Sequence, residues 1–196
     1  MISATLIVPA CNCAQILAPT LTALQSQTTG NYDIIVVDDG STDDTLEVAQ
    51  RFIGPQLSVM ACRRQGVIAA RNAGLAKTDA DAVDFCDPVD VWKPEKLQKH
   101  LMHLCQNQEV GVSFAELHDI GNTDQPDTAQ PKPRRVNMTA AYVFRHNPLR
   151  HKSGSVIRRE ALKALILNQK MCQHTANGLT RHWKNMPSKT PGCGCC

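Results

Sequence analysis

Short β-rich apolar runs alternate with helical patterns through the first hundred residues, and this alternation constrains the fold more than any other feature. Apolar runs predict strands over residues 4–8, 34–37, 57–61 and 82–86. Helical spacing of apolar residues predicts helices over residues 16–27, 43–52 and 67–76. The run at 34–37 is apolar on both faces, as in a parallel sheet covered on both sides. The sequence therefore predicts an α/β fold, a Rossmann-like, mostly parallel sheet with helices on both faces and right-handed crossovers.

The pattern weakens beyond the first hundred residues. A helix over 96–105 and a strand over 110–114 continue it, and further elements are predicted at 137–144, 155–157 and 158–167. Residues 122–135 are polar and contain three prolines, which favours an exposed loop. The length of 196 residues suits one domain over 1–167, followed by a poorly ordered, cysteine-containing tail over 168–196.

Composition excludes several classes of protein. The formal net charge of +3 is too small to indicate nucleic-acid binding, and no apolar run reaches the about 20 residues that span a bilayer. The first residues lack the features of a signal peptide, so a cytoplasmic location is expected and the nine cysteines are expected as reduced thiols. Acids concentrate between Asp33 and Asp90 and basic residues after Lys93. This asymmetry suits an acidic mouth beside a basic lobe that attracts phosphate or the inner face of a membrane.

Ligands of open α/β sheets bind beyond the carboxyl ends of the strands. The predicted loops at that edge cover residues 9–13, 38–42 and 87–90, and two of the three are rich in aspartate. In the second loop Gly40 permits a tight turn, and Ser41, Thr42 or Asp43 is expected to cap the following helix. On the predicted helix over 96–105, His100 and His103 favour a solvated face over a metal site.

Four sequence blocks carry a resemblance to a known family. They are Leu6-Ile7-Val8-Pro9-Ala10-Cys11-Asn12, Ile34-Ile35-Val36-Val37-Asp38-Asp39-Gly40-Ser41, Gln65-Gly66-x-x-x-Ala70-Arg71-Asn72 and Phe85-Cys86-Asp87-Pro88-Val89-Asp90-Val91-Trp92. In this order, they resemble the opening of family 2 glycosyltransferases of the GT-A fold. The resemblance implies a nucleotide-sugar-binding half over 1–115 and a partial acceptor half over 116–167.

The resemblance also implies which residues contact the donor. They are Pro9, Cys11, Asp38, Asp39, Arg71 and Asp87. A carboxylate such as Asp39 can accept the imide N–H of a nucleobase with charge assistance. The planar guanidinium of Arg71 suits either the diphosphate or the acidic loops, and both interpretations stay open.

One departure from the family concerns the metal. Members usually carry Asp-x-Asp-Asp where this chain has Asp87-Pro88-Val89-Asp90, so Val89 stands at the metal-binding position. Mg²⁺ and Mn²⁺ prefer hard oxygen ligands, which an isopropyl group does not supply. Asp87 and Asp90 are left as the candidate ligands of a weakly bound divalent cation.

A second departure concerns catalysis. Inverting transfer needs a general base, which the family presents in an acidic motif beyond residue 150, but residues 163–196 contain no aspartate or glutamate. Glu116 and Asp119 follow the predicted fifth strand, and neither is singled out as that base. The resemblance implies sugar transfer from a nucleotide diphosphate to a glycan, lipid or polysaccharide acceptor with inversion. The alternative is a truncated or impaired nucleotide-sugar-binding module, and a dinucleotide-binding protein is disfavoured because no Gly-x-Gly-x-x-Gly follows the first strand.

Overall fold

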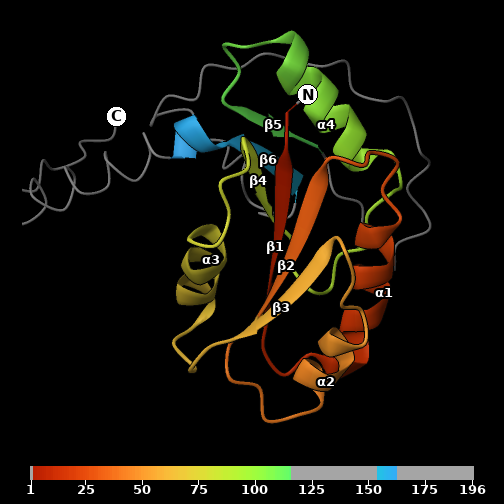
Figure 1. The fold of residues 1–196 in the computed structure, drawn as a ribbon, viewed down its shortest axis with the longest axis vertical. Helices are drawn as coiled ribbons and strands as arrows, with labels where there is room; N and C mark the ends of the chain where they lie inside the picture. Colours follow the sequence, from red (N-terminus) through yellow and green to blue (C-terminus); the bar gives the residue numbers. More distant parts are fainter. Residues whose placement is uncertain (1, 116–153, 163–196) are drawn as a thin grey trace, which may run out of the picture. The chain divides into compact units, whose positions relative to one another are not determined.

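The computed structural model describes residues 2–115 and 154–162 (Figure 1). The chain divides into two compact units, Met1–Arg159 and Glu160–Cys196, and the first contains every strand and helix described below. The predicted loop over 122–135, the helix over 137–144 and the tail over 168–196 lie outside the described residues. Within the described ranges, no helix combines the length and the apolar character needed to cross a bilayer.

The strands of the first unit follow the predicted order. They are β1 (Ala4–Ala10), β2 (Tyr32–Asp38), β3 (Leu57–Ala61), β4 (Ala82–Phe85), β5 (Val112–Phe114) and β6 (Ser155–Arg158). In the part of the chain that the structure describes, they form one sheet in the order β3-β2-β1-β4-β6-β5. The first four are parallel neighbours, whereas β6 pairs antiparallel with both β4 and β5. The predicted mostly parallel sheet is therefore confirmed.

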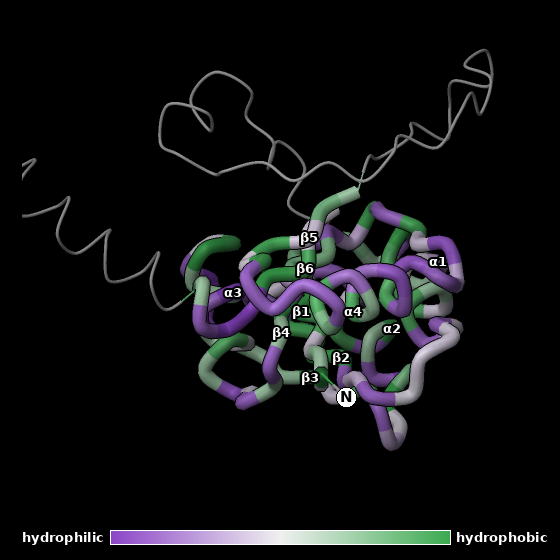
Figure 2. The backbone as a smooth tube through the Cα atoms, turned by 90° about the horizontal axis from the view of Figure 1, so that it is seen from above, coloured by the Kyte–Doolittle hydropathy of each residue, from purple (hydrophilic) through white to green (hydrophobic). Residues whose placement is uncertain are grey.

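The helices lie on both faces of the sheet. They are α1 (Ala14–Gln25), α2 (Thr45–Gln50), α3 (Val67–Leu75) and α4 (Lys96–Gln106). Figures 1 and 2 show the strands between α3 on one side and α1 and α2 on the other, with the hydrophobic colour of Figure 2 along the strands. Alternate residues of one strand serve opposite faces, since Leu6 and Val8 join one apolar cluster and Ile7 the other. Burial on both faces explains why β1 and β2 are almost continuously apolar.

Helix α3 approaches the sheet closely at Gly74. A Cβ atom added there would lie 2.5 Å from Cγ2 of Ile7 and 3.2 Å from Cγ2 of Val37. Glycine therefore sets the distance between α3 and the two central strands.

Two element boundaries differ from the prediction. The helix predicted from residue 158 begins one residue later, at residue 159, because Arg158 ends strand β6. The Arg158 guanidinium donates to backbone carbonyls of Leu104, Asn107 and Val110 near the end of α4. A cation beside the free carbonyls of a helix C-terminus is favourable. Proline 9, predicted to begin a loop, lies inside β1 opposite Val37. It is tolerated because its nitrogen points to the β4 side, where β4 has already ended at Phe85.

Candidate functional site

The predicted loops meet at one edge of the sheet. Strands β1, β2 and β3 run parallel with Ala10 beside Asp38 and Asp38 beside Ala61, so their carboxyl ends coincide. The neighbouring β4 is fixed to β1 by the Cys86 N–H, which donates to the Ile7 carbonyl at 3.0 Å. Residues that follow these strands therefore share one edge, which we call the carboxyl edge.

Asp39 joins two loops of the carboxyl edge. Its carboxylate is buried, and its two oxygens accept hydrogen bonds from the backbone amides of Gln65 (2.9 Å) and Gly66 (2.8 Å). Beside it Gly40 adopts a positive φ of 67°, and a Cβ atom there would lie 2.9 Å from the Arg64 nitrogen. Asp39 thus holds the β3–α3 loop against the β2–α2 loop. Each carboxylate oxygen has a second lone pair, so contact with a nucleobase stays a prediction.

Asp38 organises the β2–α2 loop from within. Its carboxylate accepts hydrogen bonds from the Ser41 hydroxyl and from the Ser41 N–H, the latter at 3.3 Å. The Ser41 oxygen accepts in turn from the Asn12 N–H at 3.0 Å, which joins the β1–α1 loop. The prediction that Ser41 caps the following helix is wrong, because its hydroxyl bonds Asp38 instead.

Helix α2 begins later than predicted, at Thr45, and Asp43 interacts with its start. One Asp43 oxygen accepts from the Thr45 N–H (3.1 Å) and hydroxyl (2.5 Å), and the other from the Ala14 N–H (3.2 Å). The Thr45 hydroxyl bond is the main cause that lowers the pKa of Asp43. Asp43 therefore supports the beginnings of both α1 and α2.

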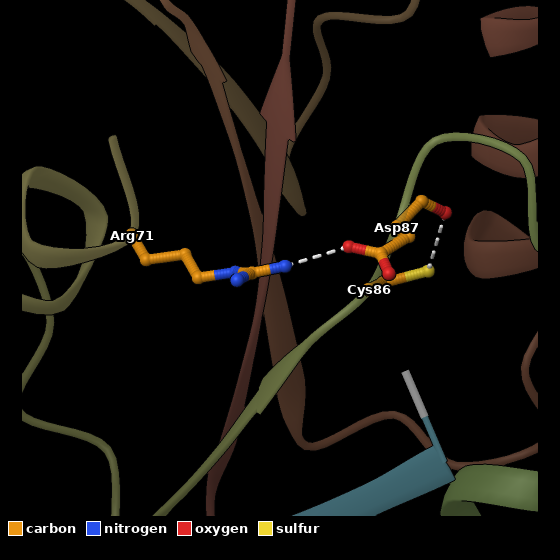
Figure 3. Close-up of polar contacts among 3 residues, drawn as sticks. All are labelled: Arg71, Cys86 and Asp87. Atoms are coloured by element: carbon orange, nitrogen blue, oxygen red, sulfur yellow. Dashed lines mark hydrogen bonds and ion pairs between the residues drawn. The ribbon is translucent and has the colours of Figure 1, made fainter. Parts of the chain in front are cut away.

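Arg71 and Asp87 form an ion pair across the carboxyl edge (Figure 3). Arg71 comes from α3 and its Nη2 lies 2.7 Å from an Asp87 oxygen just beyond β4. The Arg71 side chain is 10% exposed and that of Asp87 is 39% exposed. The Arg71 Nε is buried without a hydrogen-bond partner in the described residues, and the guanidinium carbon lies 5.9 Å from the Phe85 ring centroid. The Arg71 Nε is therefore a buried donor without a partner in the described residues, beside the partly exposed Asp87 carboxylate.

Cysteines take minor polar roles at this edge. The Cys11 thiol donates to the Asp39 carbonyl at 3.6 Å, and the Cys86 thiol donates to the Asp87 carbonyl at 3.5 Å (Figure 3). The five cysteines of the described residues are reduced, with no disulfide among them. The other four cysteines lie outside the described residues. Pro9 and Cys11 lie in the first of the segments that meet at the carboxyl edge, and their contact with the donor stays a prediction.

The predicted cation ligands are a poor match to a divalent metal. Between Asp87 and Asp90, the Val89 side chain is 60% exposed and offers only carbon. One Asp87 oxygen already accepts from Arg71. Among the residues that the structure describes, no three His, Cys, Asp or Glu side chains form a group able to hold a metal ion. Mg²⁺ and Mn²⁺ favour several hard oxygen ligands, and Asp87 and Asp90 therefore do not fit such an ion.

Sequence reasoning missed a group of buried polar side chains beneath the edge. Asp84 is completely buried in β4, and His100 of α4 is buried with its Nδ1 2.8 Å from the Ser113 hydroxyl. His103 Nδ1 lies 3.1 Å from the same hydroxyl. The predicted solvated face is therefore wrong for His100, whose pKa burial lowers to about 4. For Asp84, the signal in the sequence was an aspartate within the apolar run 82–86 that predicts a strand.

Comparison with known proteins identifies the family. A model described as glycosyl transferase family 2 matches residues 5–166. The chain belongs to this family. A crystal structure of Staphylococcus aureus TarS 1-349 in complex with UDP-GlcNAc has a TM-score of 0.68 at 21% identity, over 83% of this chain and 47% of that chain. The predicted GT-A fold is therefore confirmed.

Curated relatives agree with this assignment. An uncharacterised glycosyltransferase of Nostoc sp. is 34% identical over 128 residues, which cover 62% of this chain and 39% of that protein. The amylovoran biosynthesis glycosyltransferase AmsB of Erwinia amylovora is 34% identical over 105 residues, which cover 51% of this chain and 35% of that protein. The chain thus spans less than half the length of these relatives.

Proposed function

We propose that this chain binds a nucleoside-diphosphate sugar at its carboxyl edge and transfers the sugar, with inversion, to a glycan or lipid-linked acceptor. The observation that carries the proposal is the gathering of Asp38, Asp39 and Asp87 at one edge, with Arg71 of α3 paired to Asp87. Membership of glycosyl transferase family 2 supports sugar transfer. The structural likeness to TarS, solved with UDP-GlcNAc, supports a nucleotide-sugar donor. The relative AmsB supports an acceptor in polysaccharide biosynthesis.

The nucleoside would lie against the loops that Asp39 joins. Bonded to the Gln65 and Gly66 amides, its carboxylate is fixed before a ligand arrives and needs no reorganisation to accept a base N–H. Cys11, in the loop after β1, is partly exposed and supplies neighbouring surface, whereas Pro9 is buried in β1. Asp38 contributes indirectly, because its bonds to Ser41 shape the same loop.

The diphosphate would lie near Arg71 and Asp87. Arg71 bonds Asp87 through one nitrogen, and its guanidinium has further N–H donors. Both interpretations of Arg71 are thus compatible: it braces the acidic loop, and it offsets the charge of Asp87 where an anion approaches. We further propose that donor binding is independent of a divalent cation, since Val89 interrupts the ligand set.

We propose no general base and no acceptor contact among the described residues. Glu116 and Asp119 lie outside the described residues. The second candidate function, a nucleotide-sugar-binding module without turnover, is favoured by the exposed Val89 in place of a metal ligand. Donor binding is common to both functions, and release of the nucleoside diphosphate separates them.

Calorimetric titration with uridine and guanosine diphosphates, in EDTA and in Mn²⁺, tests the donor site. We expect binding of one of them at millimolar concentration or below, unchanged by Mn²⁺. Val89→Asp is expected to strengthen binding in Mn²⁺ alone, whereas Val91→Asp, the same change at another exposed valine two residues on, should not. No binding of either nucleotide would overturn the donor site. A wild-type affinity that rises tenfold in Mn²⁺ would overturn the metal independence.

Activity is tested by the nucleoside diphosphate released from candidate donors in the presence of lipid-linked or oligosaccharide acceptors. Acceptor-dependent release, lost in Asp87→Asn but not in the exposed control Asp33→Asn, is the expected result. Binding without release from any donor would favour the module.

A further inference from the structure

A buried carboxyl group lies directly below the acidic loop of residues 87–90. Asp84 shares its face of β4 with Ala82 and Cys86, which join the apolar cluster that includes Leu97 and Leu104 of α4. Asp84 is 0% exposed, and neither of its carboxylate oxygens has a hydrogen-bond partner in the described residues. A buried carboxylate without hydrogen bonds is costly unless a charge compensates it. Burial therefore raises the pKa of Asp84 to about 8, and a nearby cation opposes this rise.

Lys96 is that cation. It is the first residue of α4, and its ammonium lies 3.3 Å from the centroid of the Trp92 ring, a cation–π contact. Burial lowers the pKa of Lys96, while the charges of Asp84, Cys86 and Asp90 oppose that change. The ammonium therefore interacts electrostatically with Asp84 of β4 and with Asp90 of the loop.

Hydrogen bonds fix both ends of the connection from β4 to α4. The Thr20 hydroxyl donates to the Pro88 carbonyl at 2.8 Å. The Gln27 side chain donates to the Lys93 carbonyl at 3.1 Å and accepts from the Leu97 N–H at 3.0 Å. Between these anchors, the buried Trp92 ring is held against the Lys96 ammonium. Through its contact with Trp92, Lys96 thus packs against the connection that carries Asp87 and Asp90.

We propose that Lys96 is a positioning residue of the donor site: its ammonium, packed on the Trp92 ring and interacting electrostatically with Asp84 and Asp90, fixes the acidic loop and supplies a positive charge near the diphosphate. This inference rests on the proposed function. It accounts for two features together, an acidic loop whose metal position is Val89 and a partly buried lysine that interacts electrostatically with Asp90 of that loop. A charge fixed by the fold acts on the anion without a bound cation and without reorganisation.

Lys96→Met removes the charge and keeps an unbranched apolar side chain on Trp92. We expect it to weaken nucleoside-diphosphate binding, measured by calorimetry in EDTA, by about tenfold, and Lys96→Arg to restore most of the affinity. The matched control is Lys99→Met, the same change at an exposed lysine of α4, which should leave affinity within twofold. Rescue by arginine separates a role of the charge from a role of side-chain volume.

A double variant keeps the test valid if Lys96→Met alone is unstable. Lys96→Met with Asp84→Val replaces the lysine and the buried acid by apolar side chains, and such apolar replacements of a buried pair are often close to neutral in stability. We expect it to unfold near the wild-type temperature and yet bind nucleotide about tenfold more weakly. If this stable variant binds as tightly as Lys99→Met, Lys96 has no positioning role and the inference is overturned. If the wild type binds no nucleoside diphosphate at all, the proposed function itself fails.

Discussion

Asp39→Asn tests whether the carboxylate predicted to contact a nucleobase also holds the carboxyl edge together. In the wild type its two oxygens accept from the Gln65 and Gly66 amides at 2.9 and 2.8 Å. Asparagine has nearly the same shape but only one acceptor oxygen, so its NH₂ group must face one of the two amides. The variant therefore loses one charge-assisted hydrogen bond and leaves one amide without its acceptor.

The expected cost follows from those two effects. A hydrogen bond to a charged group contributes about 1.5–3 kcal/mol, and an unsatisfied buried donor costs about 1–3 kcal/mol. Gln65 and Gly66 are exposed, so water can solvate the released amide and the second effect is small. We therefore expect the free energy of unfolding to fall by about 2 kcal/mol, or about 4–8 °C in Tm for a chain of this size.

Urea unfolding measures this loss, and hydrogen exchange of the Gln65 and Gly66 amides locates it. Asp33→Asn is the matched control, because Asp33 is an exposed aspartate of β2, the strand that ends just before Asp39. The stability of this control should change by less than about 0.5 kcal/mol. Exchange at the two amides should accelerate in Asp39→Asn alone. Equal stabilities of the two variants, with both amides still protected, would refute the view that Asp39 joins the loops.

Two further predictions concern the core. Gly74→Ala should lower the free energy of unfolding in urea by about 1–2 kcal/mol, because the added Cβ lies 2.5 Å from Cγ2 of Ile7. This overpacking exceeds the gain in helix propensity from alanine. An unchanged or raised stability would contradict this prediction. Burial raises the pKa of Asp84 from 3.8 to about 8, so the folded state binds this proton more tightly than the unfolded chain and stability falls as pH rises through that window. From pH 5 to pH 8 the loss should be about 2–4 kcal/mol and should vanish in Asp84→Asn, and parallel pH profiles of the two proteins would contradict it.

The sequence was sufficient to predict the sheet because most of its strands are buried on both faces. Residues of β2 such as Ile35 and Val36 are apolar on both faces, so neither a helix nor a half-exposed strand fits them. The place of β6 was not predictable in this way. Its Val156 pairs with Asp84 on one side and Ser113 on the other, across separations that no local pattern encodes. The one-residue delay of the helix predicted from Arg158 has the same cause, since the bond of the Arg158 guanidinium to the Leu104 carbonyl of α4 is visible only in the fold.

The location of the site was predictable, but the partners of its residues were not. Parallel strands bring Asp38, Asp39 and Asp87 to one edge whatever the details of the loops. That Asp39 would bond amides 26 residues away depends on how the β3–α3 loop folds back. Asp84 was overlooked because an acid in a strand normally faces solvent, and only helix α4 over that face buries it.

The carboxylates of the edge share a property that bears on function: the protein itself has already engaged them. Asp39 is bonded to backbone amides, Asp38 to Ser41 and Asp87 to Arg71. Each of these bonds delocalises or offsets negative charge. The edge therefore repels a diphosphate less than three unbonded carboxylates would. It also has little to rearrange when a ligand arrives, which lowers the cost of binding. The same bonds that stabilise the loops therefore prepare the edge for an anion, and a variant that breaks one of them should affect stability and donor affinity together.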